Sequence, residues 1–123
     1  MFTTLLSLAL LSLPAHASPP RSALLGTYSG QGCYLKIAPA AGGQTDITFT
    51  DNWGDRTLWG VGRSLEAQLA RGANPLVFDH ARATMYDMTI HLEIELEGAR
   101  PVAMRGMGHG MMGDTTIRCA FAR

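Results

Sequence analysis

Apolar and polar residues alternate most regularly between Tyr86 and Leu96. The apolar positions are Tyr86, Met88, Ile90, Leu92, Ile94 and Leu96, and between them stand Asp87, Thr89, His91, Glu93 and Glu95. Successive side chains of a β-strand point to opposite faces of a sheet. The alternation therefore predicts one long strand with a buried face and an acidic, solvated face.

The next apolar run, Pro101 to Met107, can fold back on this strand through the turn at Gly98, Ala99 and Arg100. We expect Glu97 opposite Pro101, a register in which apolar residues meet apolar ones and opposite charges pair. A shift of one residue would lose that agreement. The expected pairs are Leu96 with Val102, Ile94 with Met104, Glu93 with Arg105, His91 with Met107, Thr89 with His109 and Asp87 with Met111.

Shorter alternations predict further strands around Cys33 to Ile37, Ile47 to Phe49 and Ile117 to Phe121. Turns are expected at Pro39 to Gln44 and at Asp51 to Asp55, where Gly, Pro, Asn and Asp supply the backbone angles that turns need. The segment from Ser64 to Gly72 fits two structures. Alternating Leu65, Ala67 and Leu69 suit a strand, while Ser64 as N-cap and Gly72 just past the end suit a short helix.

These elements predict an all-β fold of six to eight antiparallel strands, with one short helix near residues 64–71 as an option. The fold is either a closed up-and-down barrel or a compact sandwich. Both cysteines fall on the inward face of a terminal strand, so we expect the first and last strands to be neighbours. Such neighbours close a barrel, and we therefore favour the barrel.

Cys33 and Cys119 are the only two cysteines, and we expect them to form a disulfide. In an oxidising compartment a pair near opposite ends of a small domain is typical of a covalent staple. In the chain-entropy model a loop this long contributes at most about 4 to 5 kcal/mol. The alternative is two free thiols that bind a metal, but the chain has no CxxC spacing to support it.

The first 17 residues have the order of a secretory signal peptide. An apolar core from Leu5 to Leu13 is followed by Pro14 and the triplet Ala15-His16-Ala17, which predicts cleavage before Ser18. No Lys or Arg precedes the core, so only the amino terminus supplies positive charge there. The alternative is a membrane anchor, but the run from Thr3 to Leu13 is too short to span a bilayer. We expect a periplasmic or secreted protein whose single domain spans residues 18–123.

Charge and composition narrow the range of partners. The chain carries 10 basic and 10 acidic residues and is 46% apolar. A balanced charge disfavours nucleic acid, because neutralising phosphates needs clustered Lys and Arg. The apolar content disfavours intrinsic disorder. No arrangement of residues indicates catalysis, so we expect a non-catalytic module that binds a small molecule or a protein partner.

Two features could form the binding site. Gly106, Gly108 and Gly110 continue the inward face of the strand that begins at Pro101, so that face lacks side chains there and leaves room for a ligand. Alternatively, facing residues or a bend fill the space. Trp53 and Trp59 flank a turn and could anchor a partner, although such aromatics also seal the end of a barrel.

Four of the seven methionines fall between Met104 and Met112, together with His109. Thioether and imidazole ligands suit copper, especially Cu(I), in an exported protein. On a single extended strand the ligands would lie too far apart for one ion. The hairpin register adds His91 from the neighbouring strand, and the candidate copper ligands are therefore His91, Met107, His109 and Met111. The alternative is that the methionines fill an irregular core.

Two short resemblances accompany these features. Gly26-Thr27-Tyr28 resembles the first strand of lipocalin-type and avidin-type barrels, with Tyr in place of their usual Trp. A cysteine near each end of a signal-bearing β domain is similar to bacterial periplasmic lysozyme inhibitors, but no Ser-Gly-x-Arg-Tyr loop is present. No family is assigned on this basis.

Overall fold

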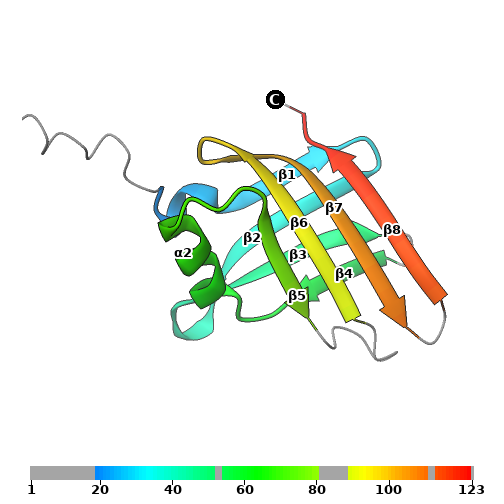
Figure 1. Ribbon diagram of the computed structural model, residues 1–123, viewed down its shortest axis with the longest axis horizontal. Coiled ribbons are helices and arrows are strands. Elements are labelled where there is room, and N and C mark those ends of the chain that lie inside the picture. Colours follow the sequence, from blue (N-terminus) through cyan, green and yellow to red (C-terminus); the bar gives the residue numbers. More distant parts are fainter. Residues whose placement is uncertain (1–18, 52–53, 81–88, 111–112, 123) are drawn as a thin grey trace, which may run out of the picture.

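The computed structural model describes residues 19–51, 54–80, 89–110 and 113–122 (Figure 1). The predicted leader, Trp53, the start of the long alternating strand at Tyr86 to Met88, and Met111 lie outside the described residues. Within these residues, eight strands and one α-helix make up most of the fold, as the sequence predicts for an all-β domain.

The strands form two four-stranded antiparallel sheets, each with its strands in chain order. The first sheet contains β1 (Gly26–Gly30), β2 (Cys33–Ala40), β3 (Gln44–Asp51) and β4 (Gly54–Leu58). The second sheet contains β5 (Leu76–His80), β6 (Thr89–Glu97), β7 (Arg100–Gly110) and β8 (Gly113–Ala120). The short 3₁₀ helices η2 (Arg21–Leu24) and η3 (Ala41–Gly43) and the helix α2 (Gly62–Ala70) complete the described elements.

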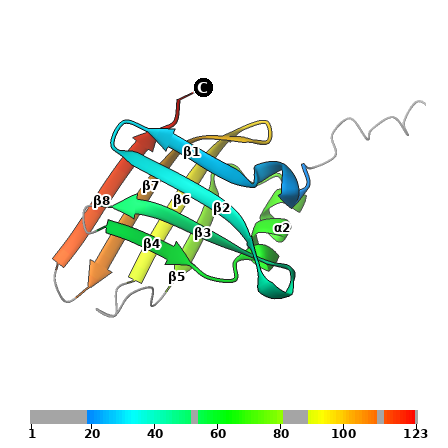
Figure 2. The same cartoon turned by 180° about the vertical axis from the view of Figure 1, so that it is seen from behind.

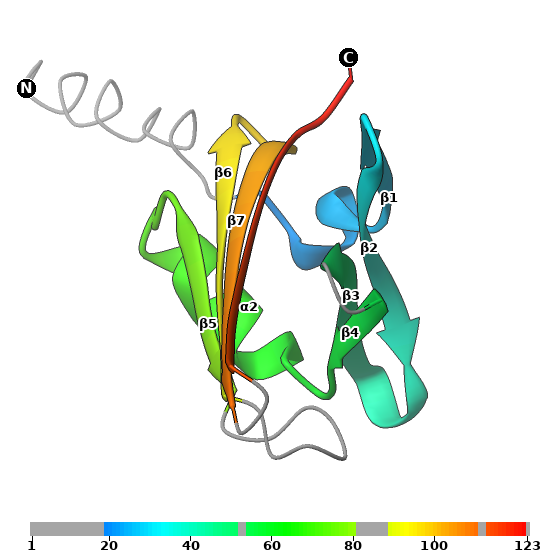
Figure 3. The ribbon, with the colours of Figure 1, turned by 90° about the vertical axis from the view of Figure 1, so that its right-hand side faces the viewer.

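The two sheets face each other as a sandwich, and of the two expected architectures the favoured barrel is not the one formed (Figure 3). Among the described residues, β1 pairs only with β2, and β8 pairs only with β7. The helix α2 separates β4 from β5 along the chain. Each sheet has a full apolar inner face, so each can cover the other without continuous hydrogen bonding around the core.

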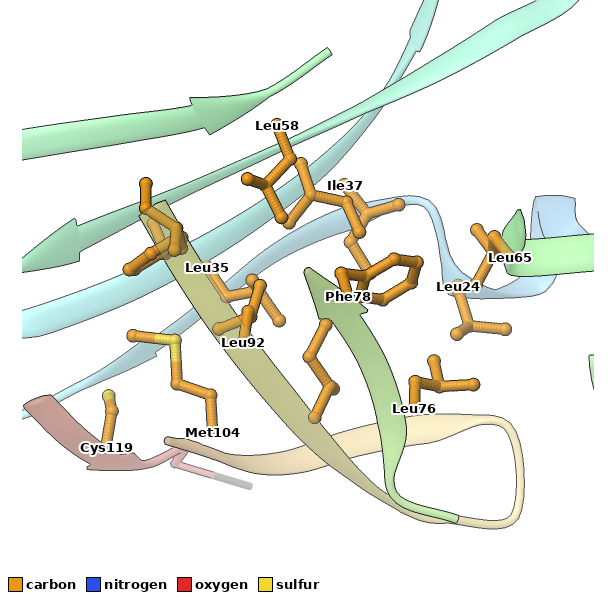
Figure 4. Packing of buried hydrophobic residues seen from close by; sticks show 14 of the residues in the cluster. Leu24, Leu35, Ile37, Leu58, Leu65, Leu76, Phe78, Leu92, Met104 and Cys119 are labelled. Atoms are coloured by element: carbon orange, nitrogen blue, oxygen red, sulfur yellow. The ribbon is translucent and has the colours of Figure 1, made fainter. Parts of the chain in front are cut away.

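The core lies between the sheets and draws on both of them and on the helices (Figure 4). Leu35 of β2, Leu92 of β6 and Leu65 of α2 are all fully buried. Met104 is 2% exposed, which confirms its prediction as a core residue. Alternate residues of each strand thus supply the interior, and their neighbours are left on the outer faces.

The segment that fitted both a helix and a strand is the helix α2. Gly72 has φ +69° just past its end, and its N–H donates to the Leu69 carbonyl at 3.1 Å. Ala73 N–H donates to the Gln68 carbonyl at 3.0 Å, which completes a Schellman motif. The helix begins at Gly62, and its N-cap is Val61, three residues before the expected N-cap Ser64. Leu65, Gln68 and Leu69 are buried at helical spacing, whereas Ala67, which a strand would bury beside Leu65 and Leu69, is exposed.

Two amide side chains complete hydrogen bonds along the outer edge of the second sheet. Gln68 of α2 accepts from Val77 N–H at 2.7 Å and donates to the Val77 carbonyl at 2.8 Å. Asn74 does the same for Leu96, with bonds of 2.9 and 2.8 Å. An open strand edge invites pairing with another chain, so these amides shield the β5 side of the sheet.

The β6–β7 register confirms the predicted hairpin over most of its length. Ile94 lies opposite Met104, Glu93 opposite Arg105 and His91 opposite Met107. The prediction is wrong near the turn, where Leu96 faces Pro101 and the register shifts between Glu95 and Leu96. The turn holds only Gly98 and Ala99, with φ +65° at Gly98, so one residue is left over and forms a bulge.

The disulfide between Cys33 and Cys119 is present, with a Cα–Cα distance of 6.1 Å. Cys33 begins β2 rather than the first strand, because β1 precedes it. The first and last strands are nevertheless neighbours at this corner, where Ala122 N–H donates to the Ser29 carbonyl at 2.8 Å. In Figure 2 β1 reaches the end of β8 at this corner. The first and last strands therefore meet at one corner, as neighbours, but they do not pair through hydrogen bonds along their length.

Candidate functional site

Three of the predicted site residues, His91, Met107 and His109, lie on the outer face of the second sheet. Its polar positions form two adjacent rows across the strands. The first row holds Asp79, His91, Met107 and Thr116, and the second holds Thr89, His109 and Asp114. These residues line a depression of about 500 Å³, together with Ile90, Gly108 and Thr115. We call it the histidine depression.

His91 lies at the centre of an ionic network. Its Nδ1 is 2.6 Å from Asp79 Oδ1, and its Nε2 is 2.8 Å from Glu93 Oε2. The same Glu93 oxygen accepts from Arg105 Nη2 at 3.2 Å. The side chains of His91 and Glu93 are only 29% and 27% exposed, whereas Asp79 is 74% exposed. Glu93 is therefore part of a half-buried network, and not simply one member of a solvated acidic stripe.

This network favours the charged form of both inner groups. Hydrogen bonds to Glu93 and then to Asp79 raise the pKa of His91 above its ordinary 6.5, against the opposing effect of burial. The hydrogen bond from His91, assisted by Arg105, lowers the pKa of Glu93. A carboxylate bound at each ring nitrogen requires both nitrogens to donate. The arrangement therefore favours the imidazolium form of His91.

A second histidine–carboxylate pair stands in the neighbouring row. His109 Nδ1 is hydrogen-bonded to Asp114 Oδ1 across β7 and β8. Thr89 Oγ1 donates to the His109 carbonyl at 3.2 Å. Both His109 and Asp114 are mostly exposed, so this pair forms the open wall of the histidine depression.

The structure brings together part of the predicted copper set. His91 and Met107 are opposed on β6 and β7, and His109 follows two residues after Met107 on the same face. Met111 lies outside the described residues. Both nitrogens of His91 are already hydrogen-bonded to carboxylates. Across the described residues, no three His, Cys, Asp or Glu side chains are grouped to hold a metal, and copper binding stays a prediction.

A second depression of about 470 Å³ adjoins the first along the same face. Glu93, Glu95, Arg105 and Arg118 supply its charged groups. Arg105 and Arg118 are directly opposed on β7 and β8. The charged groups of this second depression are thus acidic on β6 and basic on β7 and β8.

Inside the sandwich, the space left by Gly106 is filled. A Cβ at Gly106 would lie 2.9 Å from Phe49 Cε2 and 3.3 Å from Ile117 Cγ2. This matches the alternative in which facing residues occupy the space. Gly108 is buried and contributes instead to the floor of the histidine depression, and Gly110 is half-buried at the end of β7.

Of the two tryptophans that could anchor a partner, only Trp59 is among the described residues. It lies between β4 and α2 and is 64% exposed. Its predicted companion Trp53 lies outside the described residues. A binding role for this pair stays a prediction.

Asp79 and Asp114 are the two site residues that the sequence pattern alone does not predict as partners of the histidines. Each is placed by strand pairing, Asp79 opposite His91 and Asp114 opposite His109. The short apolar run from Leu76 to Phe78, followed by Asp79, was the available signal for β5, but the strand is only five residues long. The register of two further hairpins was needed to find both carboxylates.

No family model, curated protein or solved structure matches this chain. Among the helices of residues 19–122 that the structure describes, none combines the length and apolarity needed to cross a membrane.

Proposed function

We propose that this protein is an exported, non-catalytic binding module that holds a small organic molecule in the histidine depression. The observation that carries the proposal is the convergence of His91, Met107, His109 and two carboxylates on one depression of about 500 Å³. Pockets for small ligands span about 300 to 1,000 Å³ and combine apolar surface with a few polar groups. The disulfide is compatible with an exported location.

The lining favours a ligand with an apolar body and a basic nitrogen. Met107 provides a flexible apolar surface in the depression, and Gly108, which has no side chain, leaves room beside it. Asp79 and Asp114 stand at its two sides, and each uses Oδ1 for its histidine. A carboxylate accepts more than one hydrogen bond, so each can also accept from a ligand ammonium group.

The state of His91 supports binding rather than catalysis. A general base needs an unprotonated nitrogen within reach of the substrate. Both nitrogens of His91 are instead engaged in hydrogen bonds with carboxylates, and Glu93 is in turn held by Arg105. The network fixes the positions of charged groups, which is what selective binding needs.

Titration with dansylcadaverine, which joins a naphthalene ring to a primary amine, tests the proposal. We expect saturable binding that shifts the Met107 methyl signal and the ring signals of His91 and His109 in NMR spectra. Asp79→Asn and Asp114→Asn should each weaken binding about three- to tenfold, since each removes one exposed charge partner. Glu95→Gln is the matched control, because it removes a charge from the same sheet face outside the depression.

The neutral N-acetyl derivative of the probe separates charge recognition from general apolar adsorption. We expect it to bind more weakly than the amine. Equal binding of both probes, or an amine that shifts signals elsewhere and leaves His91 and Met107 unmoved, would refute the site.

Copper binding is the second candidate, favoured by the direct opposition of His91 and Met107. Copper would have to displace at least one carboxylate from His91, which costs an ion-paired hydrogen bond. Equimolar Cu(I) should then shift the His91, His109 and Met107 signals. If these signals do not move, copper binding at this face is wrong.

A further inference from the structure

We propose that two copies of this protein pair through their β8 strands around a two-fold axis at Thr116, which joins the second sheets into one continuous sheet. The inference is independent of the proposed ligand. It follows from three features of β8: which backbone groups are free, where β1 stops covering them, and how the charges of the strand are ordered.

Hydrogen bonds past the end of β8 show which backbone groups point away from β7. Phe121 N–H donates to the Val102 carbonyl at 2.9 Å, while Ala122 N–H points the other way, to Ser29 of β1. Backbone groups of successive strand residues point to opposite sides, so the even-numbered residues of β8 direct theirs to the open edge. These residues are Asp114, Thr116, Arg118 and Ala120.

The first sheet covers only the end of this edge. A Cβ on Gly30 would lie 2.3 Å from the Ala120 carbonyl oxygen, so β1 closely approaches β8 at that residue. From Asp114 to Arg118, no described residue outside β7 is hydrogen-bonded to the backbone of β8. In Figure 1 β8 is the outermost strand of its sheet. The opposite edge, β5, is by contrast closed by Gln68.

The order of charges along β8 fits a second copy of the same strand. With Thr116 opposite itself in an antiparallel pair, Asp114 faces the partner's Arg118, and Arg118 faces the partner's Asp114. Opposite charges therefore meet twice, and threonine meets threonine at the axis, both favourable cross-strand pairs. The same register sets Thr115 against Ile117 on the inner face, so the two faces keep their polarity.

The free backbone groups fit the same register. Asp114, Thr116 and Arg118 would each form a hydrogen-bonded pair with the partner, and each such pair exchanges two N–H···O bonds. The shared segment ends where β1 begins to cover Ala120. An isologous contact of this kind closes on itself and produces a dimer rather than a fibre. β8 also lacks the lysine, proline or inward charge that commonly protects an exposed edge.

Pairing would also bring a new cation to the histidine depression. Asp114 lines the depression through its bond to His109, and in the dimer the partner's Arg118 lies beside it. The Asp114 carboxylate can accept from both groups, because it has several lone pairs.

Sedimentation equilibrium of the disulfide-bonded protein between about 1 μM and 1 mM tests the inference. We expect a monomer–dimer equilibrium for the wild type. Thr116→Pro should be monomeric yet folded, because proline removes an N–H that points away from β7 and is tolerated on such an edge. Near-UV circular dichroism checks that this variant keeps its packed core.

Charge reversal identifies the register. Asp114→Arg or Arg118→Asp alone places like charges opposite each other and should weaken dimerisation at least tenfold. Combining both reversals should restore it, whereas the exposed control Lys36→Glu on β2 should leave it unchanged. A wild type that stays monomeric throughout, a dimer that survives Thr116→Pro, or a double reversal that fails to recover would each overturn the proposal.

Discussion

Replacing Gly106 with alanine should destabilise the protein, although alanine normally suits a strand better than glycine does. The added Cβ would lie 2.9 Å from Phe49 Cε2, 3.5 Å from Phe49 Cζ and 3.3 Å from Ile117 Cγ2. A real Cβ does not approach carbon at 2.9 Å, so the Phe49 ring must move. Phe49 is 2% exposed within the core between the two sheets, and the ring has no free space toward solvent.

Two opposing terms set the magnitude. Overpacking a well-filled core costs about 1 to 3 kcal/mol. Alanine restricts the unfolded chain more than glycine does, and this stabilises the folded protein by about 0.4 to 1 kcal/mol. The clash is with a locked aromatic ring, so we expect the first term to win and the free energy of unfolding to fall by about 1 to 2 kcal/mol.

Urea unfolding of the two proteins measures this difference. With an m value of about 2 kcal/mol/M, the midpoint should fall by roughly 0.5 to 1 M. Phe49→Leu provides the second arm of a double-mutant cycle. If the ring causes the cost, the double variant should be more stable than the sum of the single changes predicts, by about 1 kcal/mol. A Gly106→Ala variant at least as stable as the wild type would refute this packing argument.

Three further predictions concern the elements around the site. Gln68→Ala leaves both Val77 backbone groups without their partner and should cost about 2 to 4 kcal/mol in urea unfolding, whereas Ser64→Ala removes only the Ser64–Gln68 bond and should cost far less. The raised pKa of His91 means that its stabilising effect is complete below its ordinary 6.5 and is lost as pH rises through the higher folded value. The stability difference between wild type and His91→Gln should therefore shrink as pH rises, and a difference that grows instead would contradict the network. Replacing both cysteines by serine opens a loop whose ends are 86 residues apart and should lower the free energy of unfolding by up to about 4 to 5 kcal/mol. A loss near zero would contradict the chain-entropy explanation of the disulfide's effect.

The part of the fold that depends on one alternating strand could be predicted from the sequence. The register from Thr89 to Glu95 with β7 followed from matching apolar faces and pairing Glu93 with Arg105, and it is the register observed. The bulge beyond Glu95 could not be predicted, because it depends on how tightly Gly98 and Ala99 turn. That geometry is fixed by the backbone and leaves no periodic signal.

The alternation of apolar and polar residues does not distinguish a barrel from a sandwich, because it does not show which edge strands lie side by side. The Cys33–Cys119 disulfide and one hydrogen bond from Ala122 to Ser29 bring the first strands and the last strand together in either architecture. Closure requires β1 and β8 to run side by side along their length, whereas here they meet at one corner. The crossing angle of two sheets arises from their twist, which no single strand encodes.

The same alternation explains why the candidate chemistry lies outside the sandwich. Alternate residues of the second sheet, such as Phe78, Leu92 and Met104, contribute to the core, and Phe49 fills the space beside Gly106. The remaining positions must carry any polar function, and there the two histidines each acquire a carboxylate from a neighbouring strand. Shifting β6 by one residue would bury His91 and Glu93 and expose Leu92. The hydrophobic core therefore fixes the register, and the register alone assembles the site.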